Sequence, residues 1–314
     1  MSLPHDFCES ESAVDAQAPV VNMIGPMASA ETVPQAAAGY LHVDRSTLIL
    51  PAYDEAGISS SLRYVADHED ISHVLIDGPD SLSLSAACLR SIVEGLAELD
   101  HVRMIRFTSR VPAVQPERIV RNRELLDLIA EYSGSERSIY VMMRFHHPDE
   151  VNEAAIEAFR ALSEAGAGLL AEVPFLPDPA ANADTIAELL SGLTQAGVIP
   201  YQFVLDAGGQ GAITLERAYR LAEAAKSRVS GPARRARLTM KHETGFFEIL
   251  AIENGKAYMK SHRSRHDANG RFMIKECPPG AKSFEDLAGG PLSERTGKTP
   301  SSATYLKVPY EIPD

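Results

Sequence analysis

The chain lacks tryptophan and is poor in aromatic residues and cysteine. Aromatic side chains make up 6% of its 314 residues, and the three cysteines are Cys8, Cys88 and Cys277. They lie far apart in sequence, with none of the short spacings typical of a zinc knuckle, a redox pair or a cluster-binding loop. We therefore expect each cysteine to be a free thiol.

Basic residues are outnumbered, and long apolar runs are missing. The chain has 30 Lys and Arg against 43 Asp and Glu, a formal net charge of -13. Nucleic-acid binding needs Lys and Arg clustered on one face, so this balance opposes it. No stretch approaches the roughly 20 apolar residues that cross a bilayer, and no basic region precedes an apolar block at the N-terminus. We expect a cytoplasmic protein that binds neither nucleic acid nor membrane.

The distribution of apolar residues predicts an arm followed by an α/β region. Residues 1–40 show no sustained period, which is typical of a flexible N-terminal arm. From residue 41 to 245, short aliphatic runs alternate with amphipathic segments, as in a parallel sheet covered by helices. The expected strands are Ser46–Leu50, His73–Asp77, Val102–Phe107, Ile139–Phe145, Gly168–Val173, Tyr201–Asp206 and Arg237–Lys241. The expected helices are Leu84–Leu99, Glu150–Ala165, Ala183–Ala196 and Leu215–Ser227.

The remaining residues, 246–314, predict a different kind of structure. Phe246–Ile252 and Lys256–Lys260 flank Asn254-Gly255, and Asn-Gly is a strong signal for a two-residue hairpin turn. From Pro278 onward the chain is rich in Pro and Gly. We expect a hairpin and an irregular C-terminal extension that packs on a complete or partial TIM-like (βα) barrel.

Several expected strands end in polar residues, and function gathers at the carboxyl ends of strands in parallel α/β folds. Histidine and carboxylate side chains there can serve as general acids and bases, or could hold a divalent metal such as Zn or Mn. Arginine and lysine could bind a carboxylate or phosphate. The catalytic candidates are His146, His147, Glu172, Asp206 and His242. The candidates for anion binding are Arg106, Arg110, Lys241 and Arg263.

One segment carries a resemblance to a known family. Residues 106–119, Arg-Phe-Thr-Ser-Arg-Val-Pro-Ala-Val-Gln-Pro-Glu-Arg-Ile, closely resemble the Ile-Arg-x-x-[ST]-Arg-Val-Pro-x-x-x-Pro-x-Arg-Ile sequence of the lysine 2,3-aminomutase family. Residues 74–85 are similar to that family's Gly-Gly-Asp-Pro-Leu loop, and residues 145–150 to its His-Pro-Asn-Glu segment. Residues 172–176 and Pro200-Tyr201 with Asp206 also match in order and spacing. The resemblance spans residues 45–275 and implies a radical-SAM-type partial barrel, with Asp80 near the cofactor.

The chain departs from the family pattern at three places. The family has a Cys-x-x-x-Cys-x-x-Cys loop after its first strand, whereas residues 50–60 contain no cysteine. Pro79 stands at the second glycine of the SAM-contacting loop, and proline removes a backbone N–H there. Phe246 stands where the family has the lysine that carries pyridoxal phosphate, and phenylalanine cannot form an imine. We therefore expect no iron–sulfur cluster, no pyridoxal phosphate and no SAM in the family pose.

Three functions remain open. The residues favour a cluster-less relative that binds an amino acid or a related small anionic metabolite, as a sensor or as a partner subunit of an active enzyme or homo-oligomer. The second is an enzyme, isomerase-like or a lyase, that uses polar acid–base or His/carboxylate metal chemistry on an amino-acid-type substrate. The third is a true aminomutase whose cluster lies at a non-standard site, built for example from Cys8, Cys88 and Cys277.

Overall fold

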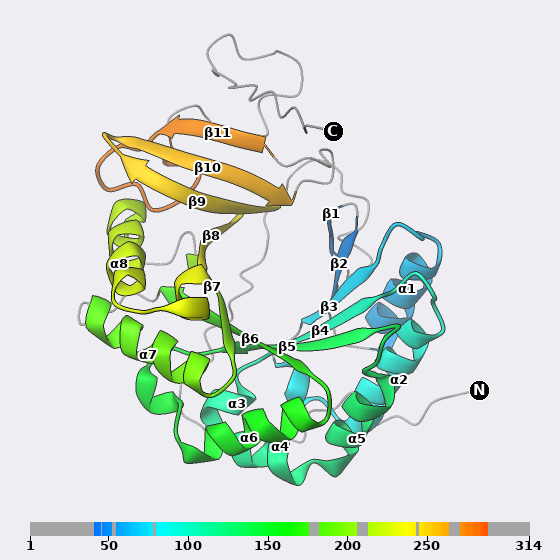
Figure 1. The fold of residues 1–314 in the computed structure, drawn as a ribbon. Helices are drawn as coiled ribbons and strands as arrows, with labels where there is room; N and C mark the ends of the chain where they lie inside the picture. The colour runs from blue at the N-terminus through cyan, green and yellow to red at the C-terminus, as the bar shows by residue number, and fades with distance from the viewer. Residues whose placement is uncertain are drawn as a thin grey trace, which may run out of the picture.

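The computed structural model describes residues 41–44, 46–51, 55–77, 80–175, 182–205, 213–242, 245–263 and 271–287. The expected N-terminal arm lies outside these residues. The described strands form one sheet of eleven strands whose order in space follows their order in sequence (Figure 1). The strands are β1 (Leu41–Asp44), β2 (Thr47–Pro51), β3 (His73–Asp77), β4 (Met104–Ser109), β5 (Ser138–Arg144), β6 (Gly168–Phe175), β7 (Ile199–Leu205), β8 (Arg237–His242), β9 (Gly245–Glu253), β10 (Lys256–Arg263) and β11 (Arg271–Glu276).

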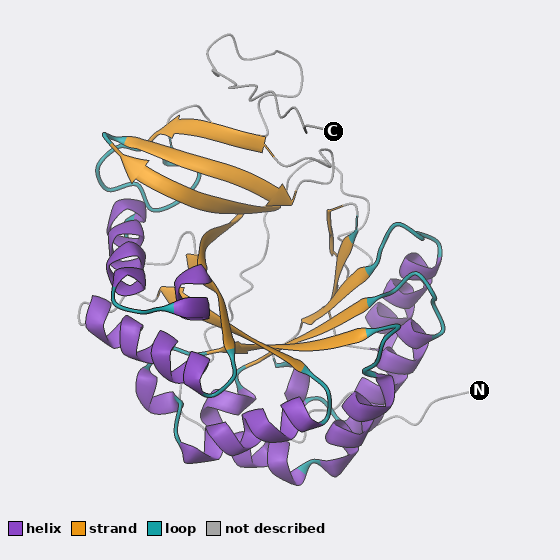
Figure 2. Ribbon diagram, viewed as in Figure 1, coloured by secondary structure: helices purple, strands orange, loops and turns teal. Residues whose placement is uncertain are grey.

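The sheet is parallel from β2 to β8 and antiparallel at both ends. Helices lie on the outside of the curved parallel part (Figure 2). They are α1 (Glu55–Ala66), α2 (Ala86–Ala97), α3 (Val111–Val114), α4 (Pro116–Arg121), α5 (Arg123–Tyr132), α6 (Glu153–Glu164), α7 (Ala183–Gln195) and α8 (Leu215–Ser227), with short 3-10 turns η2 (Ser81–Ser83), η3 (Pro148–Glu150) and η4 (Gly231–Arg235). The α/β class is therefore confirmed. No pairing joins β1 to β11 within the described ranges, so closure into a barrel is not observed.

All seven expected strands are present, with ends that differ by at most two residues. The four expected helices are present too, but α1, α3, α4 and α5 were missed. Pro112 and Pro116 each stand in the first turn of a short helix, α3 and α4. Proline is well tolerated there, because the N–H that it lacks has no partner within the helix.

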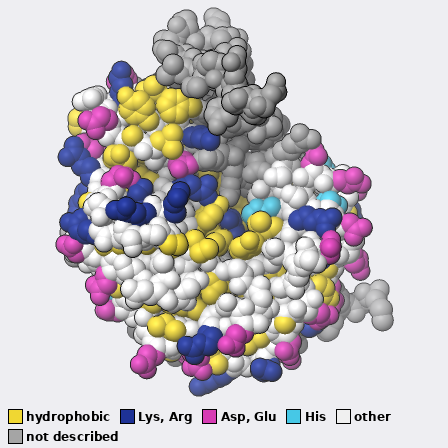
Figure 3. Space-filling model, viewed as in Figure 1, with side chains coloured by type: hydrophobic (Ala, Val, Ile, Leu, Met, Phe, Trp, Pro, Cys, Tyr) yellow, Lys and Arg dark blue, Asp and Glu magenta, His cyan; other side chains and the backbone are white. Residues whose placement is uncertain are grey.

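The Asn-Gly hairpin is confirmed. Asn254 and Gly255 have φ values of 52° and 68°, the left-handed geometry of a tight two-residue turn. β9 also pairs with β8, so the hairpin continues the main sheet, and the unexpected β11 extends it by one strand. The outward side of this end carries the exposed apolar side chains Leu250, Phe272 and Ile274, and hydrophobic side chains gather over it in Figure 3.

The expectation of three free thiols needs one correction. Cys277 is free and buried, but Cys88, which is fully buried in α2, is disulfide-bonded. Cys8 lies outside the described residues.

Within the described ranges, no helix is both long enough and apolar enough to cross a membrane.

Arg137, directly before β5, ties three elements together. Its Nε donates to the Val102 carbonyl at 3.0 Å, and its Nη2 donates to the Ala97 carbonyl at 3.1 Å, at the C-terminal end of α2. The last carbonyls of a helix, here that of Ala97, have no partner within the helix, and a cation is favourable at this end. Burial, the largest effect, and the nearby charge of Arg103 lower the pKa of Arg137.

We predict that Arg137→Ala lowers the free energy of unfolding by about 1–3 kcal/mol, because buried carbonyls lose their donors. The matched control is Arg103→Ala, since Arg103 pairs with Glu136 through exposed side chains and should change stability by less than about 1 kcal/mol. Urea unfolding of both variants measures the difference. Equal effects of the two substitutions would contradict this role.

Candidate functional site

The strands β3–β8 present two different faces. Alternate side chains, among them Val74, Phe107 and Phe203, pack into the hydrophobic core beneath the helices. Because side chains alternate along a strand, those between them point to the opposite side, here called the inner face, which is the concave side of the sheet in Figure 2. This face carries buried polar side chains, namely Arg106, Thr108, Glu172, Gln202 and Thr239.

Glu172 on β6 is the centre of a hydrogen-bonded row across three strands. Its Oε1 accepts a hydrogen bond from Nε of Arg144 on β5 at 2.9 Å, and its Oε2 accepts one from Nε2 of Gln202 on β7 at 2.7 Å. The side chains of Arg144 and Glu172 are 18% and 8% exposed. Hydrogen bonds to charged groups gain strength in such a poorly hydrated place. Both oxygens of the Glu172 carboxylate are engaged.

A β-bulge in β7 brings Gln202 beside Glu172. Pro200 pairs with Ala171, but the next pairing joins Gln202 to Glu172, which leaves Tyr201 as the extra residue. A bulge of this kind re-aims the side chains that follow it, and proline, which lacks an N–H, is tolerated at such an irregularity. In regular pairing, Tyr201 would take the place beside Glu172.

Arg144 keeps part of its hydrogen-bonding capacity. Among the described residues, its guanidinium bonds through Nε to Glu172, and neither Nη1 nor Nη2 donates to another group. Burial, the largest effect, lowers the pKa of Arg144. The attraction of Glu172 and the hydrogen bond to it, with smaller contributions from the charges of Asp77 and Asp80, outweigh burial and leave the pKa raised.

A second polar cluster lies where β4 and β5 end. Nη2 of Arg110 donates to Oε1 of Glu150 at 2.8 Å, and Oε2 of Glu150 accepts from the backbone N–H of His146 at 2.7 Å. Nη1 of Arg110 lies against the His146 ring, 2.6 Å from Nε2. Burial first, and then the charges of Arg110 and Arg144, lower the pKa of His146, although Glu150 acts in the opposite direction. These surroundings therefore favour the neutral form of His146.

Asp80 fixes the loop after β3 to the end of β4. Its Oδ1 accepts from Ser109 Oγ at 2.6 Å and its Oδ2 from the backbone N–H of Arg110 at 2.6 Å. Ser81 donates to and accepts from the Thr108 backbone. Burial, the largest effect, raises the pKa of Asp80, and these hydrogen bonds offset it in part. The residue predicted to lie near the cofactor thus holds two strand ends together.

The other predicted residues have different positions. His147 does not join His146, because its side chain is 55% exposed and lies 3.2 Å from the Asp149 carboxylate. Arg106 is buried on the inner face of β4. β8 ends with Lys241 and His242, and β10 ends with Arg263, but the structure does not describe the side chains of these three residues. Asp206 lies outside the described residues. Within the described ranges, no three His, Cys, Asp or Glu side chains are grouped as a metal ion requires.

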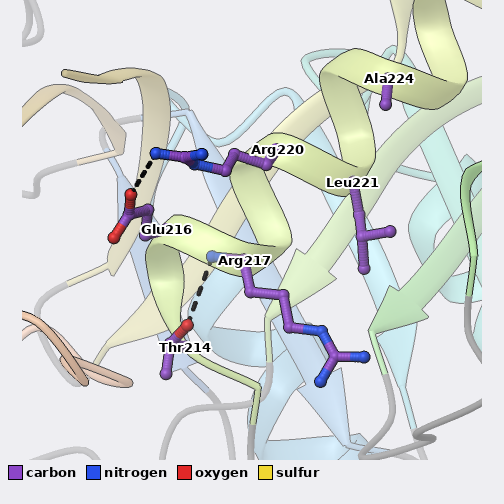
Figure 4. A pocket seen from close by; sticks show the side chains of 6 residues that line it. All are labelled: Thr214, Glu216, Arg217, Arg220, Leu221 and Ala224. Atoms are coloured by element: carbon purple, nitrogen blue, oxygen red, sulfur yellow. Dashed lines mark hydrogen bonds and ion pairs between the residues drawn. The ribbon is translucent and has the colours of Figure 1, made fainter.

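A cavity of about 570 Å³ lies elsewhere, along the outer side of α8 (Figure 4). It is lined by Thr214, Glu216, Arg217, Arg220, Leu221 and Ala224. Glu216 and Arg220 form an ion pair at 2.6 Å, and Thr214 caps the helix by accepting from the Arg217 N–H. None of the residues predicted to be functional lines this cavity.

Comparison with known proteins agrees with the resemblance seen in the sequence. A protein of Aquifex aeolicus described as "Putative L-lysine 2,3-aminomutase" is 34% identical over 251 residues, which cover 77% of this chain and 67% of that protein. The chain belongs to the lysine 2,3-aminomutase family. The L-lysine 2,3-aminomutase of Escherichia coli is 32% identical over 148 residues, and the glutamate 2,3-aminomutase of Clostridioides difficile 31% over 115 residues. These matches cover 42% and 26% of the two proteins. No protein-family model matches the chain.

Membership of the lysine 2,3-aminomutase family implies the radical-SAM fold and corrects the cofactor expectation. Lysine 2,3-aminomutases are radical-SAM enzymes that use an iron–sulfur cluster, SAM and pyridoxal phosphate. The expectation that this chain has none of them was wrong, because it rested on a missing cysteine spacing, Pro79 and Phe246 alone. Since the described residues include no group of metal ligands, we assign none of them to a cofactor and derive no reaction step through one.

Three further residues, Arg144, Gln202 and Glu150, were not predicted from the sequence. Arg144 stands two residues before the predicted His146 and two after Met142, so strand periodicity could have placed it on the inner face. Gln202 could not be found in this way, because the bulge at Tyr201 changes the alternation.

We predict that the protein becomes less stable as the pH is lowered, and that part of this loss is due to His146. A base whose pKa is lowered in the folded state binds fewer protons there than in the unfolded chain. Stability is therefore retained above the ordinary value of 6.5 and lost as the pH falls below it. His146→Gln should flatten this dependence in urea unfolding between about pH 5 and 8. His147→Gln is the matched control and should keep the parental slope, and the same slope in all three proteins would refute the assignment.

Proposed function

We propose that the protein binds a free amino acid, or a related small carboxylate, at the inner face of its sheet. The observation that carries the proposal is Arg144, whose guanidinium is held at Nε by Glu172 while Nη1 and Nη2 donate to no other described residue. A guanidinium edge with two parallel N–H groups matches the geometry of a carboxylate. Partial burial strengthens such a pair by excluding water.

The charges around Arg144 also suit an amino acid better than a simple acid. Asp77, at the end of β3, and Asp80 are near enough for their charges to act on Arg144. A ligand with a carboxylate toward Arg144 and an ammonium group toward Asp77 would be favourable at both ends. Membership of the lysine 2,3-aminomutase family supports the same ligand class, because the relatives' names contain lysine and glutamate. The binding step is common to a sensor, a partner subunit and an enzyme.

Isothermal titration with L-lysine and L-glutamate tests the proposal, with cadaverine as the analogue of lysine that lacks the carboxylate. We expect binding of at least one amino acid and none of cadaverine. Arg144→Met should weaken binding by about tenfold or more, because a hydrogen bond to a charged group is lost. Arg220→Met on α8 is the control and should bind as the parent does. Unchanged binding by Arg144→Met would refute the assigned site.

The relatives' names support a second candidate, a 2,3-aminomutase reaction on the bound amino acid. We predict that protein reconstituted anaerobically with iron, sulfide, pyridoxal phosphate, SAM and a reductant converts lysine or glutamate to its β-isomer, detected by mass spectrometry. The Escherichia coli relative treated in parallel is the control. Product from the relative and none from this protein would leave amino-acid binding as the supported function.

A further inference from the structure

Glu172 is placed to serve Arg144 instead of transferring protons. Its carboxylate is buried, one oxygen accepts from Arg144 Nε, and the other accepts from Gln202 Nε2. A carboxylate bonded to an arginine in a binding site can have two opposite effects. It can compete with an incoming carboxylate for the guanidinium, or it can hold the guanidinium in the orientation that the ligand needs.

We propose that Glu172 is a positioning residue that, held by Gln202, orients the Nη1 and Nη2 groups of Arg144 toward the carboxylate of the ligand. This inference rests on the proposed amino-acid binding. In this proposal, Glu172 and Gln202 make the site selective for a planar carboxylate by orienting Arg144.

The pattern of hydrogen bonds argues for orientation and against competition. A carboxylate that competed with the ligand would engage the arginine through two parallel N–H groups, as bidentate pairs do. Here Gln202 occupies the second oxygen of Glu172, so the contact with Arg144 is made through Nε alone. The guanidinium is planar, and one fixed N–H therefore sets the direction of the others.

The backbone also supports this role. Arg144, Glu172 and Gln202 stand on adjacent strands in direct register, and the bulge at Tyr201 aligns Gln202 with Glu172. Strands hold a site more precisely than loops do. An arginine that is already oriented loses less rotamer freedom when a ligand binds, which favours affinity.

Two substitutions of Glu172 distinguish orientation from competition. Glu172→Gln keeps an acceptor for Arg144 Nε, because the Gln202 amide can rotate to pair with the new amide, and we expect L-lysine or L-glutamate to bind within about threefold of the parent. Glu172→Ala removes the acceptor, and we expect binding to weaken by about tenfold or more. Equal or tighter binding by Glu172→Ala in isothermal titration would overturn the proposal, since it would mean competition.

Gln202→Glu gives a readout that a merely structural role would not change. Two adjacent carboxylates share a proton at low pH, because one of the two pKa values is raised. The shared proton replaces the Gln202 hydrogen bond, so affinity should be near parental at about pH 5 and should fall as the pair ionises, whereas the parent stays flat. Parallel pH profiles would contradict the proposal.

Thermal unfolding and circular dichroism of each variant show whether it is folded. If Glu172→Ala does not fold, Gln202→Leu provides a second test. It should weaken binding less than Arg144→Met does. The outcomes also separate the two proposals. If Arg144→Met binds as the parent does, the proposed function fails. If Arg144→Met loses binding while Glu172→Ala and Gln202→Leu keep it, the positioning role alone fails.

Discussion

A guanidinium can remain largely buried in a protein when its charge is paired, and the inner face of this sheet is arranged around that constraint. Arg144 stands on a central strand with 18% of its side chain exposed and depends on Glu172 beside it. Burying two charges costs free energy that their attraction repays only with good geometry and further hydrogen bonds. Gln202 supplies the further bond. The bulge at Tyr201 follows from the same need, because it places the amide in reach.

The loops around this row are also held by charged groups. Asp80 joins the loop after β3 to the end of β4, and Glu150 joins η3 to the backbone of His146 and to Arg110. Loops at the carboxyl ends of parallel strands carry function in α/β folds, and their geometry must be maintained when they are not regular structure. The carboxylates of Asp80 and Glu150 thus form structural hydrogen bonds. Arg144, in contrast, keeps Nη1 and Nη2 as donors for a ligand.

The family assignment and the inner-face row rest on different kinds of observation. The match to the Aquifex aeolicus protein covers most of the chain, whereas Arg144, Glu172 and Gln202 are identified by their distances. The departures at residues 50–60, Pro79 and Phe246 are real differences of sequence, but they were too narrow a basis for excluding the family's cofactors. Local motifs report local geometry, and a cofactor site is assembled from several parts of a fold.

The sequence by itself determined the α/β class, the parallel strands, four of the five longest helices and the Asn-Gly turn. These features follow from local periodicity and from the backbone freedom of single residues. It also indicated that polar groups gather where the strands end. The edge strand β11 was decided by tertiary structure, because the strand with which it pairs sets its position. The site was also decided by tertiary structure. His146 and His147 are neighbours in sequence but have different partners. Arg144, Glu172 and Gln202 meet because three strands align and one of them bulges.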